Sequence, residues 1–242
     1  MSPKFLLIET SSRLCSVAIS NGDDIIWSES EIEVTGFCHA EKLHMLIDRA
    51  IKDSFGNKPS SIKKIDAIGL AGGPGSYTGL RIGASAAKGL ALPLNIPLIA
   101  YSSLAALAHA GKDSVPQDQK IGGFWAAMDA KRLEVYSSMF DENIYRLSAD
   151  EPFLLDEQPI PKNWSKYSDI WASGDGVEKA MKYWPGLKDT EIRYAEARHG
   201  LPLSLSAWQS KNFVSLVNWV PNYLKVYKPG KANLGLPEMG LK

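Results

Sequence analysis

A glycine-rich loop is the segment whose residue types and spacing suit the binding of an anion. Gly72, Gly73, Gly75 and Gly79 stand between an apolar run and the start of a helical pattern. Backbone N–H groups at such a turn, together with the positive end of the helix dipole, can hold a phosphate. No Lys-Ser or Lys-Thr pair follows the last glycine, and the spacing is one residue longer than the dinucleotide fingerprint. The loop is therefore either a phosphate site or a tight turn that lets a helix lie close on a sheet.

A polar turn after the first apolar run offers a second set of candidate ligands. Glu9 stands at the carboxyl end of an expected strand, and the hydroxyl groups of Thr10 and Ser11 follow it. These groups either serve the metal or phosphates of a nucleotide or form an ordinary polar turn. Asp175, between two glycines, is ambiguous in the same way, because it can also cap the helix that follows. The two loops supply the candidate phosphate or nucleotide residues Glu9, Thr10, Ser11, Gly73, Gly75, Ser76, Thr78 and Arg81.

The histidines and serines predict neither a metal site nor a hydrolase. His39 and His44 are five residues apart, so on one helix they point about 140° away from each other and cannot share a metal ion. His109 and His199 are isolated in the sequence. No Gly-x-Ser-x-Gly elbow occurs, because the serine of the glycine loop stands in the wrong place. We therefore predict no catalytic residue and no metal ligand in this chain.

Composition indicates an ordinary globular protein of the cytoplasm. The 242 residues are 45% hydrophobic, and 27 Lys and Arg balance 27 Asp and Glu, so no overall field draws the molecule to nucleic acid or an anionic membrane. Two cysteines, Cys15 and Cys38, are too few for a disulfide scaffold. The apolar stretch before Glu9 is shorter than a signal-peptide core or a membrane span.

The elements that position these loops follow from the hydrophobic periodicity. Strands are expected over 5–8, 15–19 and 24–34, with a hairpin turn at Asn21-Gly22 between the last two. The next expected elements are a helix over 39–51, a strand over 65–70, a helix over 80–92, a strand over 97–101 and a helix from 102 or 103 to 109. This order opens the chain with an antiparallel meander and continues it with βα units.

A second block repeats part of this pattern without repeating its residues. Strands are expected over 124–129, 134–140 and 143–147, then a strand over 169–172 and a helix over 177–183. Residues 203–220 are apolar and mixed in period, and residues 225–242 form a tail rich in Pro, Gly and Lys that we expect to be partly mobile.

A row of small residues marks the helix behind the glycine loop. Gly79, Gly83, Ala87 and Ala91 recur every four residues, which lets another element approach the helix closely. Either this helix is buried in its own domain, or the row meets a partner subunit together with the apolar side of the 39–51 helix. The second alternative gives the candidate partner interface Leu43, Leu46, Ile47, Ala50, Gly79, Gly83, Ala87 and Ala91.

Three segments resemble the TsaB (YeaZ) family. They are Ile8-Glu9-Thr10-Ser11-Ser12, Cys15-Ser16-Val17-Ala18 and, most specifically, the run from Gly73 to Gly83. The similarity runs from about residue 4 to 110 and less clearly through 173–176 and 221–224. It implies an α/β protein of the actin/sugar-kinase/Hsp70-like (ASKHA) fold, with two related domains that each hold a mixed sheet flanked by helices. We place these domains at 1–103 and 104–242, with an end segment able to pack back on the first.

The resemblance also implies a function. TsaB-like proteins act as a non-catalytic scaffold or activating subunit for threonylcarbamoyl transfer to the adenosine beside the tRNA anticodon, with TsaD and TsaE as partners. TsaD carries a metal-binding His-x-x-x-His motif where this chain reads Tyr101 to Ala108, and the family usually has Asp where Glu9 stands. The resemblance further implies that the two helices of the candidate interface meet the corresponding pair of TsaD, or of a second copy in a homodimer.

Ligands are expected in the complex rather than in the isolated chain. The resemblance implies no cofactor for the chain alone, and ATP, ADP or threonylcarbamoyl-adenylate within the complex, where tRNA is also bound. Two other functions stay open from the sequence: a glycoprotease of the M22 type, and a stand-alone small-molecule kinase of the ASKHA fold.

Overall fold

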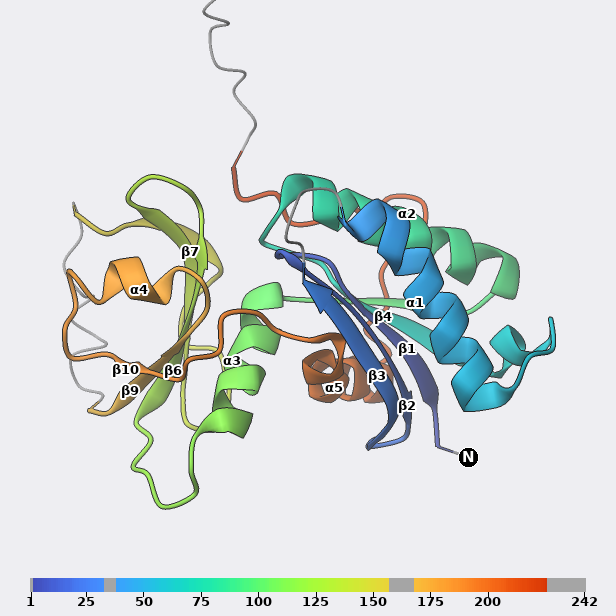
Figure 1. Cartoon of the computed structure of the whole chain (residues 1–242), viewed down its shortest axis with the longest axis horizontal. Coiled ribbons are helices and arrows are strands. Elements are labelled where there is room, and N and C mark those ends of the chain that lie inside the picture. The colour runs from blue at the N-terminus through green and yellow to red at the C-terminus, as the bar shows by residue number, and fades with distance from the viewer. Residues whose placement is uncertain (1, 33–37, 157–167, 226–242) are drawn as a thin grey trace, which may run out of the picture.

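Two five-stranded sheets with the same strand order organise the chain (Figure 1). The computed structural model describes residues 2–32, 38–156 and 168–225. The first sheet has the order β3-β2-β1-β4-β5, built from β1 (Lys4–Glu9), β2 (Leu14–Asn21), β3 (Asp24–Ile32), β4 (Ala67–Ala71) and β5 (Leu98–Tyr101). The second has the order β10-β9-β6-β7-β8, built from β6 (Gly123–Asp129), β7 (Glu134–Phe140), β8 (Glu151–Leu154), β9 (Ile170–Ser173) and β10 (Lys188–Asp189). We call the parts built on them the first and second lobes.

The pairing pattern is duplicated as well as the order. In each sheet the first three strands in sequence pair antiparallel, and the fourth and fifth strands join parallel on the other side of the first. The recurrence that the sequence pattern predicts is therefore confirmed at the level of topology, and the mixed sheets with flanking helices confirm the predicted α/β fold class.

Helices cover both faces of the first sheet. On one face lie α1 (Cys38–Phe55) and α2 (Tyr77–Leu94), packed on Leu6 and Ile8 of β1. On the other face, α5 (Leu201–Gln209) and the short η2 (Ala197–Gly200) pack on Phe5 and Leu7. Successive side chains of a strand point to opposite faces, so the continuous apolar run of β1 is explained by burial on both sides. Each such side chain contributes roughly 1.5–3 kcal/mol on full burial.

The third helix lies between the two sheets (Figure 1). Helix α3 (Ser103–Ser114) packs on Phe124, Ala126 and Met128 of β6, and the same core cluster includes Ala71 and Tyr101 of the first lobe. Ser102 starts the helix, because its side chain accepts a hydrogen bond from the Ala105 N–H at 3.2 Å. The far face of the second sheet packs on α4 (Val177–Ala180). The lobes therefore share apolar packing.

The end of the described chain packs on the first lobe. Val214 forms a bridge to Leu98 of β5, and the Asn222 N–H donates to the Gly72 carbonyl oxygen at 2.7 Å. The predicted domain limits themselves stay a prediction. Residues 33–34 of the expected third strand, and residues 226–242 of the expected mobile tail, lie outside the described residues.

One predicted strand is wrong. Residues 143–147 form a turn with a single bridge between Arg146 and Phe140, and the third strand of the second meander is β8 instead. The Asp141 carboxylate accepts hydrogen bonds from the N–H groups of Asn143 and Tyr145 at 2.9 and 2.8 Å. A side chain that captures nearby backbone donors in this way competes with strand pairing.

No helix among the described residues is long and apolar enough to cross a membrane.

Candidate functional site

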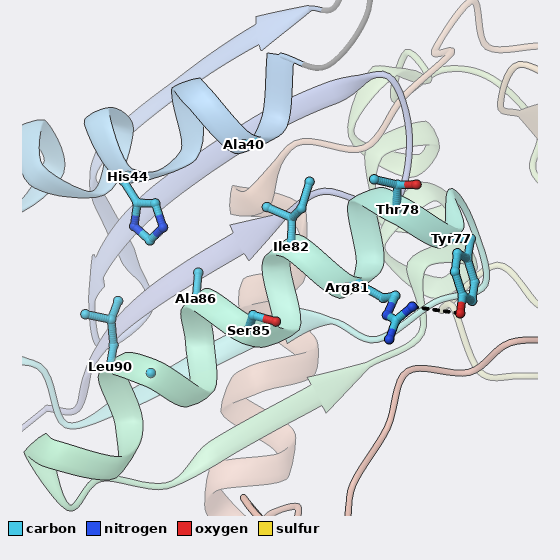
Figure 2. Close-up of a pocket in the computed structure, with 10 residues that line it drawn as sticks. Ala40, His44, Tyr77, Thr78, Arg81, Ile82, Ser85, Ala86 and Leu90 are labelled. Atoms are coloured by element: carbon cyan, nitrogen blue, oxygen red, sulfur yellow. Dashed lines mark hydrogen bonds between the residues drawn. The ribbon is translucent and has the colours of Figure 1, made fainter.

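A groove runs along the outer side of α1 and α2 (Figure 2). It encloses about 660 Å³, and α1 contributes Ala40 and His44 while α2 supplies the rest of the lining: Tyr77, Thr78, Arg81, Ile82, Ser85, Ala86, Gly89 and Leu90. A second cavity of about 460 Å³ shares His44 and Leu90 with the first and extends to the loop around Pro59. The two helices thus present one continuous, mostly apolar hollow on the outside of the first lobe.

The predicted small-residue row does not line this groove. Ala87 and Ala91 are completely buried, and Gly79 and Gly83 are buried as well. A Cβ on Gly83 would stand 2.3 Å from Thr10 Oγ1 and 3.2 Å from Leu70 Cδ1, so the row faces its own sheet, at β4 and at the turn that follows β1. This corrects the expectation that these four residues form a partner surface: they let α2 lie close on β1, which is the other alternative that the sequence left open.

The α1 residues of the predicted interface are also in the core. Leu43, Leu46 and Ala50 are at most 1% exposed and pack under the helix, whereas Ile47, 5% exposed, also reaches the second cavity. An apolar stripe on an amphipathic helix faces its own core first. The hollow is therefore carried by the outward side of the same helices, to which Ile47 alone of the predicted set contributes.

A separate cleft of about 350 Å³ lies between the lobes. Three of the predicted phosphate residues line it, namely Ser11, Gly75 and Ser76. The rest of its lining is Ser12, Arg13, Tyr77, Met128, Asp129, Ala130, Lys131, Tyr136 and Asp175. Thr78 and Arg81 lie on the outer groove instead. Glu9, Thr10 and Gly73 are not part of the cleft lining. The structure therefore divides the predicted loop set among three places.

Backbone donors of the glycine loop are used inside the protein. The Ser76 N–H donates to the Ser11 carbonyl oxygen at 2.6 Å, and the Gly73 N–H donates to Ser103 Oγ at 3.1 Å. The Gly79 N–H donates to Ser76 Oγ at 3.3 Å, which caps α2. A Cβ on Gly75 would stand 2.2 Å from the Ser11 carbonyl oxygen, so the two loops are in direct backbone contact. These contacts favour the tight-turn reading of the loop.

Glu9 points into the interior rather than into the cleft. Its side chain is 1% exposed, its Oε1 accepts a hydrogen bond from the Ser11 N–H at 2.6 Å, and its Oε2 has no hydrogen-bond partner among the described residues. Burial raises the pKa of the Glu9 carboxyl to about 7, although the hydrogen bonds from Ser11 oppose the rise. Burial, and secondarily the Glu9 charge, raises the pKa of the neighbouring Tyr101 well above its ordinary value.

The cleft holds two carboxylates, Asp129 and Asp175, of which only Asp175 was predicted from the sequence. Asp175 does not cap α4; its Oδ1 accepts the Asp129 N–H at 2.8 Å, and the Lys179 ammonium donates to Asp129 Oδ1 at 2.6 Å. Burial, with the Asp129 charge, raises the pKa of Asp175. Burial also acts to raise the pKa of Asp129, but the hydrogen bonds from Lys179 and from the Lys131 N–H, together with the charges of these two lysines, lower it overall. Asp129 ends β6 as Glu9 ends β1, so the duplicated strand order is the signal that points to it.

His39 and His44 have different surroundings, as their spacing predicts. His39 is buried with Nε2 3.3 Å from the Leu14 carbonyl oxygen, whereas His44 lines the outer groove. Burial lowers the pKa of His109 to about 4 and also lowers that of His199. Within the described part of the chain, no group of three or more His, Cys, Asp or Glu side chains is placed to hold a metal ion.

A strap, residues 214–225, crosses the outside of the first lobe and reaches the second. The Lys88 ammonium donates to the Trp219 carbonyl oxygen at 2.6 Å, and the rings of Tyr223 and Tyr77 lie 4.9 Å apart. At its end, Lys225 donates to the Ala130 carbonyl oxygen at 3.2 Å.

The last strap residue makes two more contacts with the second lobe. The Lys225 ammonium forms an ion pair with Glu134 and lies 5.8 Å from the ring centroid of Tyr136. The residues of this strap show neither a helical nor a strand period. It nonetheless joins α2, the glycine loop and the β6–β7 hairpin.

Comparison with known proteins agrees with the resemblance. A family model described as TsaD, tRNA N6-adenosine threonylcarbamoyltransferase, matches residues 33–151. The chain is 25% identical to the tRNA threonylcarbamoyladenosine biosynthesis protein TsaB of Escherichia coli, over 92% of this chain and 94% of the relative. It is 30% identical to TsaB of Buchnera aphidicola subsp. Schizaphis graminum, over 85% of this chain and 95% of the relative.

A solved structure extends this similarity to the fold. YeaZ from Pseudomonas aeruginosa aligns with a TM-score of 0.74 at 24% identity, covering 92% of this chain and all of that one. Sequence relatives and fold thus agree over nearly the whole length, and the chain belongs to the TsaB (YeaZ) family of tRNA threonylcarbamoyladenosine biosynthesis proteins.

Proposed function

We propose that this chain acts in tRNA threonylcarbamoyladenosine biosynthesis as a non-catalytic subunit that docks TsaD through the outer groove of α1 and α2. The groove carries this proposal: it is open, mostly apolar and outward-facing, and it is formed by helices within the segment that the TsaD family model matches. Contiguous exposed apolar surface of this kind is typical of an interaction site. Neither a glycoprotease nor a small-molecule kinase is favoured by the comparisons.

The likeness to TsaD suggests how the two chains pair. Related subunits can use the same surface on both sides of an approximate two-fold axis, so that each helix pair packs on its counterpart. A second copy of this chain offers the same pair of helices, and a homodimer through this groove is the expected arrangement when TsaD is missing. Gly89 suits such contact, because no atom lies within 4 Å of a Cβ placed there and the groove stays open beside it.

The packed glycine loop supports the non-catalytic part of the proposal. The backbone N–H groups of Ser76 and Gly73 donate hydrogen bonds to Ser11 and Ser103. The Glu9 side chain is buried away from the cleft. We infer that TsaD carries out the transfer in the cytoplasm, and that TsaE, tRNA and ATP, ADP or threonylcarbamoyl-adenylate are bound by the assembled complex. The isolated chain is expected to bind tRNA weakly, since its formal net charge is zero and each phosphate contact needs a cation.

Gly89→Arg tests the docking face. The arginine would project into the groove without disturbing the core, because Gly89 is exposed and unobstructed. We expect TsaD association, measured by analytical ultracentrifugation, to weaken about fivefold to a hundredfold or more, as overpacking a close contact does. Formation of modified tRNA with TsaD and TsaE should fall in parallel.

Gly186→Arg is the matched control, since Gly186 is also exposed and unobstructed but lies in the second lobe. It should retain both association and modification. Undiminished TsaD binding by a folded Gly89→Arg variant would contradict the assignment of this face.

A further inference from the structure

A pocket of about 320 Å³ lies between α2 and the strap, on the other side of the α2 ridge from the outer groove. Its lining shares a cationic and aromatic character and consists of Tyr77, Arg81, Ala84, Ser85, Lys88, Trp219, Val220, Pro221 and Tyr223. Pockets for small ligands span about 300–1,000 Å³, so this volume suits a single small unit rather than an extended molecule. Tyr77, Arg81 and Ser85 line both hollows, which makes them the ridge between the two.

The two cations of this pocket are not neutralised by carboxylates. Arg81 donates to the Tyr77 hydroxyl oxygen at 2.9 Å, and Lys88 donates to the Trp219 carbonyl oxygen at 2.6 Å. Both acceptors are uncharged, and neither cation belongs to an ion pair among residues 2–32, 38–156 and 168–225. Two positive charges therefore remain at one wall, where an anionic group can approach them.

Three aromatic rings stand beside these charges. The Tyr77 ring is half exposed and lies 4.9 Å from that of Tyr223, and the Arg81 guanidinium lies 5.1 Å from the Tyr77 ring centroid. The Lys88 ammonium lies 5.8 Å from the Trp219 ring centroid. Aromatic faces next to cations are the combination that stacks a nucleobase and pairs with its phosphate.

The charge of this pocket separates it from the cleft between the lobes. The cleft sets Asp129 and Asp175 against Arg13 and Lys131, so its lining is balanced in formal charge and presents carboxylates to an anion. The pocket lining holds two cations and no acid. Of the two sites, a phosphate-bearing ligand fits the pocket better.

We propose that the pocket between α2 and the strap binds one nucleotide unit of RNA, with the base stacked on Tyr223 or Tyr77 and the phosphate between Arg81 and Lys88. This inference rests on the proposed function in that it makes the modified tRNA the source of the RNA. A free adenine nucleotide has the same chemistry, so the test compares both. One such contact gives weak binding by the isolated chain and adds to the affinity of the complex.

The test uses the isolated full-length chain and a fluorescein-labelled oligoadenylate, with binding followed by fluorescence anisotropy at several salt concentrations. Tyr223→Leu removes the ring and keeps apolar bulk; we expect affinity to fall about fivefold to a hundredfold, the usual cost of losing one stacked base. Tyr223→Trp should restore it. Arg81→Gln and Lys88→Gln should each reduce the slope of log affinity against log salt, and the double variant should reduce it by about 0.7, the value for one phosphate contact on a single strand.

Matched controls are Tyr145→Leu and Lys182→Gln, exposed side chains of the same types in the second lobe. Equal affinities for Tyr223→Leu and Tyr145→Leu, or no change of salt slope in Arg81→Gln, overturn the proposal. So does wild-type binding too weak to detect at low salt. If AMP displaces the oligoadenylate at a nucleotide concentration far below that of the oligoadenylate, the site prefers the free nucleotide and the RNA assignment is wrong. TsaD is absent throughout, so failure here leaves the Gly89→Arg test of docking unaffected.

Discussion

The Thr10 carbonyl oxygen lies 2.1 Å from the position that a Cβ atom on Gly79 would occupy, so the first turn of α2 rests directly on the backbone that follows β1. Gly79→Ala must therefore push two backbone segments apart, and we expect it to lower the free energy of unfolding by about 1–3 kcal/mol or more. Gly89→Ala on the same helix meets nothing within 4 Å and should raise it by up to about 1 kcal/mol through helix propensity. Urea unfolding of both variants measures the contrast; equal stabilities would show that α2 is not seated this closely.

Ala87→Trp tests whether Ala87 of α2 faces the first sheet or a partner subunit. Ala87 is completely buried against the sheet, so a tryptophan there cannot be accommodated without moving α2. We expect loss of cooperative unfolding or a fall in stability of about 3 kcal/mol or more, above the usual range for overpacking because the added volume is large. Near-ultraviolet circular dichroism and thermal unfolding test this. A stable Ala87→Trp protein that merely fails to bind TsaD would place the small-residue row back on the partner surface.

Glu9 makes stability depend on pH. Its pKa is about 7 in the folded protein and near 4.5 when exposed, so the folded state keeps a proton that the unfolded state releases between these values. Stability from the buried neutral carboxyl is therefore fully present below about pH 4.5 and is lost as the pH rises through 7. Glu9→Gln does not titrate. Its free energy of unfolding relative to wild type should thus rise by about 2–3 kcal/mol from pH 5 to pH 8.

Urea titrations at pH 5, 6, 7 and 8 on wild type and Glu9→Gln give this difference directly, because the other groups cancel. Glu41→Gln, which removes an exposed carboxyl, is measured alongside as the surface control. A flat difference for Glu9→Gln would mean that the carboxyl is solvated or paired in solution.

Lys225→Met cuts the link between the strap and the second lobe. The Lys225 and Glu134 side chains are 41% and 18% exposed, so their ion pair contributes about 0–1 kcal/mol to global stability. We expect little change in melting temperature but faster amide hydrogen exchange across residues 214–225, because local opening needs less energy than unfolding. Lys131→Met, at an 88% exposed side chain, should leave that exchange unchanged. Unaltered exchange in Lys225→Met would show that the strap is held by its first-lobe contacts alone.

The sequence predicted the positions of helices and strands better than it predicted which neighbour each helix face contacts. The 3.6-residue spacing of Leu43, Leu46 and Ala50 placed α1 correctly, and the Asn21-Gly22 turn placed the β2–β3 hairpin. The row at Gly79 and Gly83 was ambiguous, because a sheet underneath and a partner helix outside both require small residues. Only the tertiary structure decides which neighbour comes close.

Parts of the candidate site were beyond prediction for a related reason. Alternation along β1 turns Glu9 to the face opposite Ile8, toward the interior around Tyr101, but the sequence does not reveal what covers that face. The Asp129 N–H donates a hydrogen bond to the carboxylate of Asp175, which lies 46 residues away in the sequence. Only the folded chain therefore brings these two residues together at the cleft. The strap has neither helical nor strand period, and its place follows from single long-range hydrogen bonds such as that of Lys88.

The packing of η2 and α5 on one face of the first sheet has a consequence for synthesis on the ribosome. Phe5, Leu7 and Ile99 are sealed by Ala197 and Leu201, which are made roughly a hundred residues after β5 is complete. At translation rates of about 5–20 residues per second, the nascent first lobe exposes that apolar face for about 5–20 s. The first half of this protein therefore cannot finish folding as it emerges, and it is a natural client for chaperones during that interval.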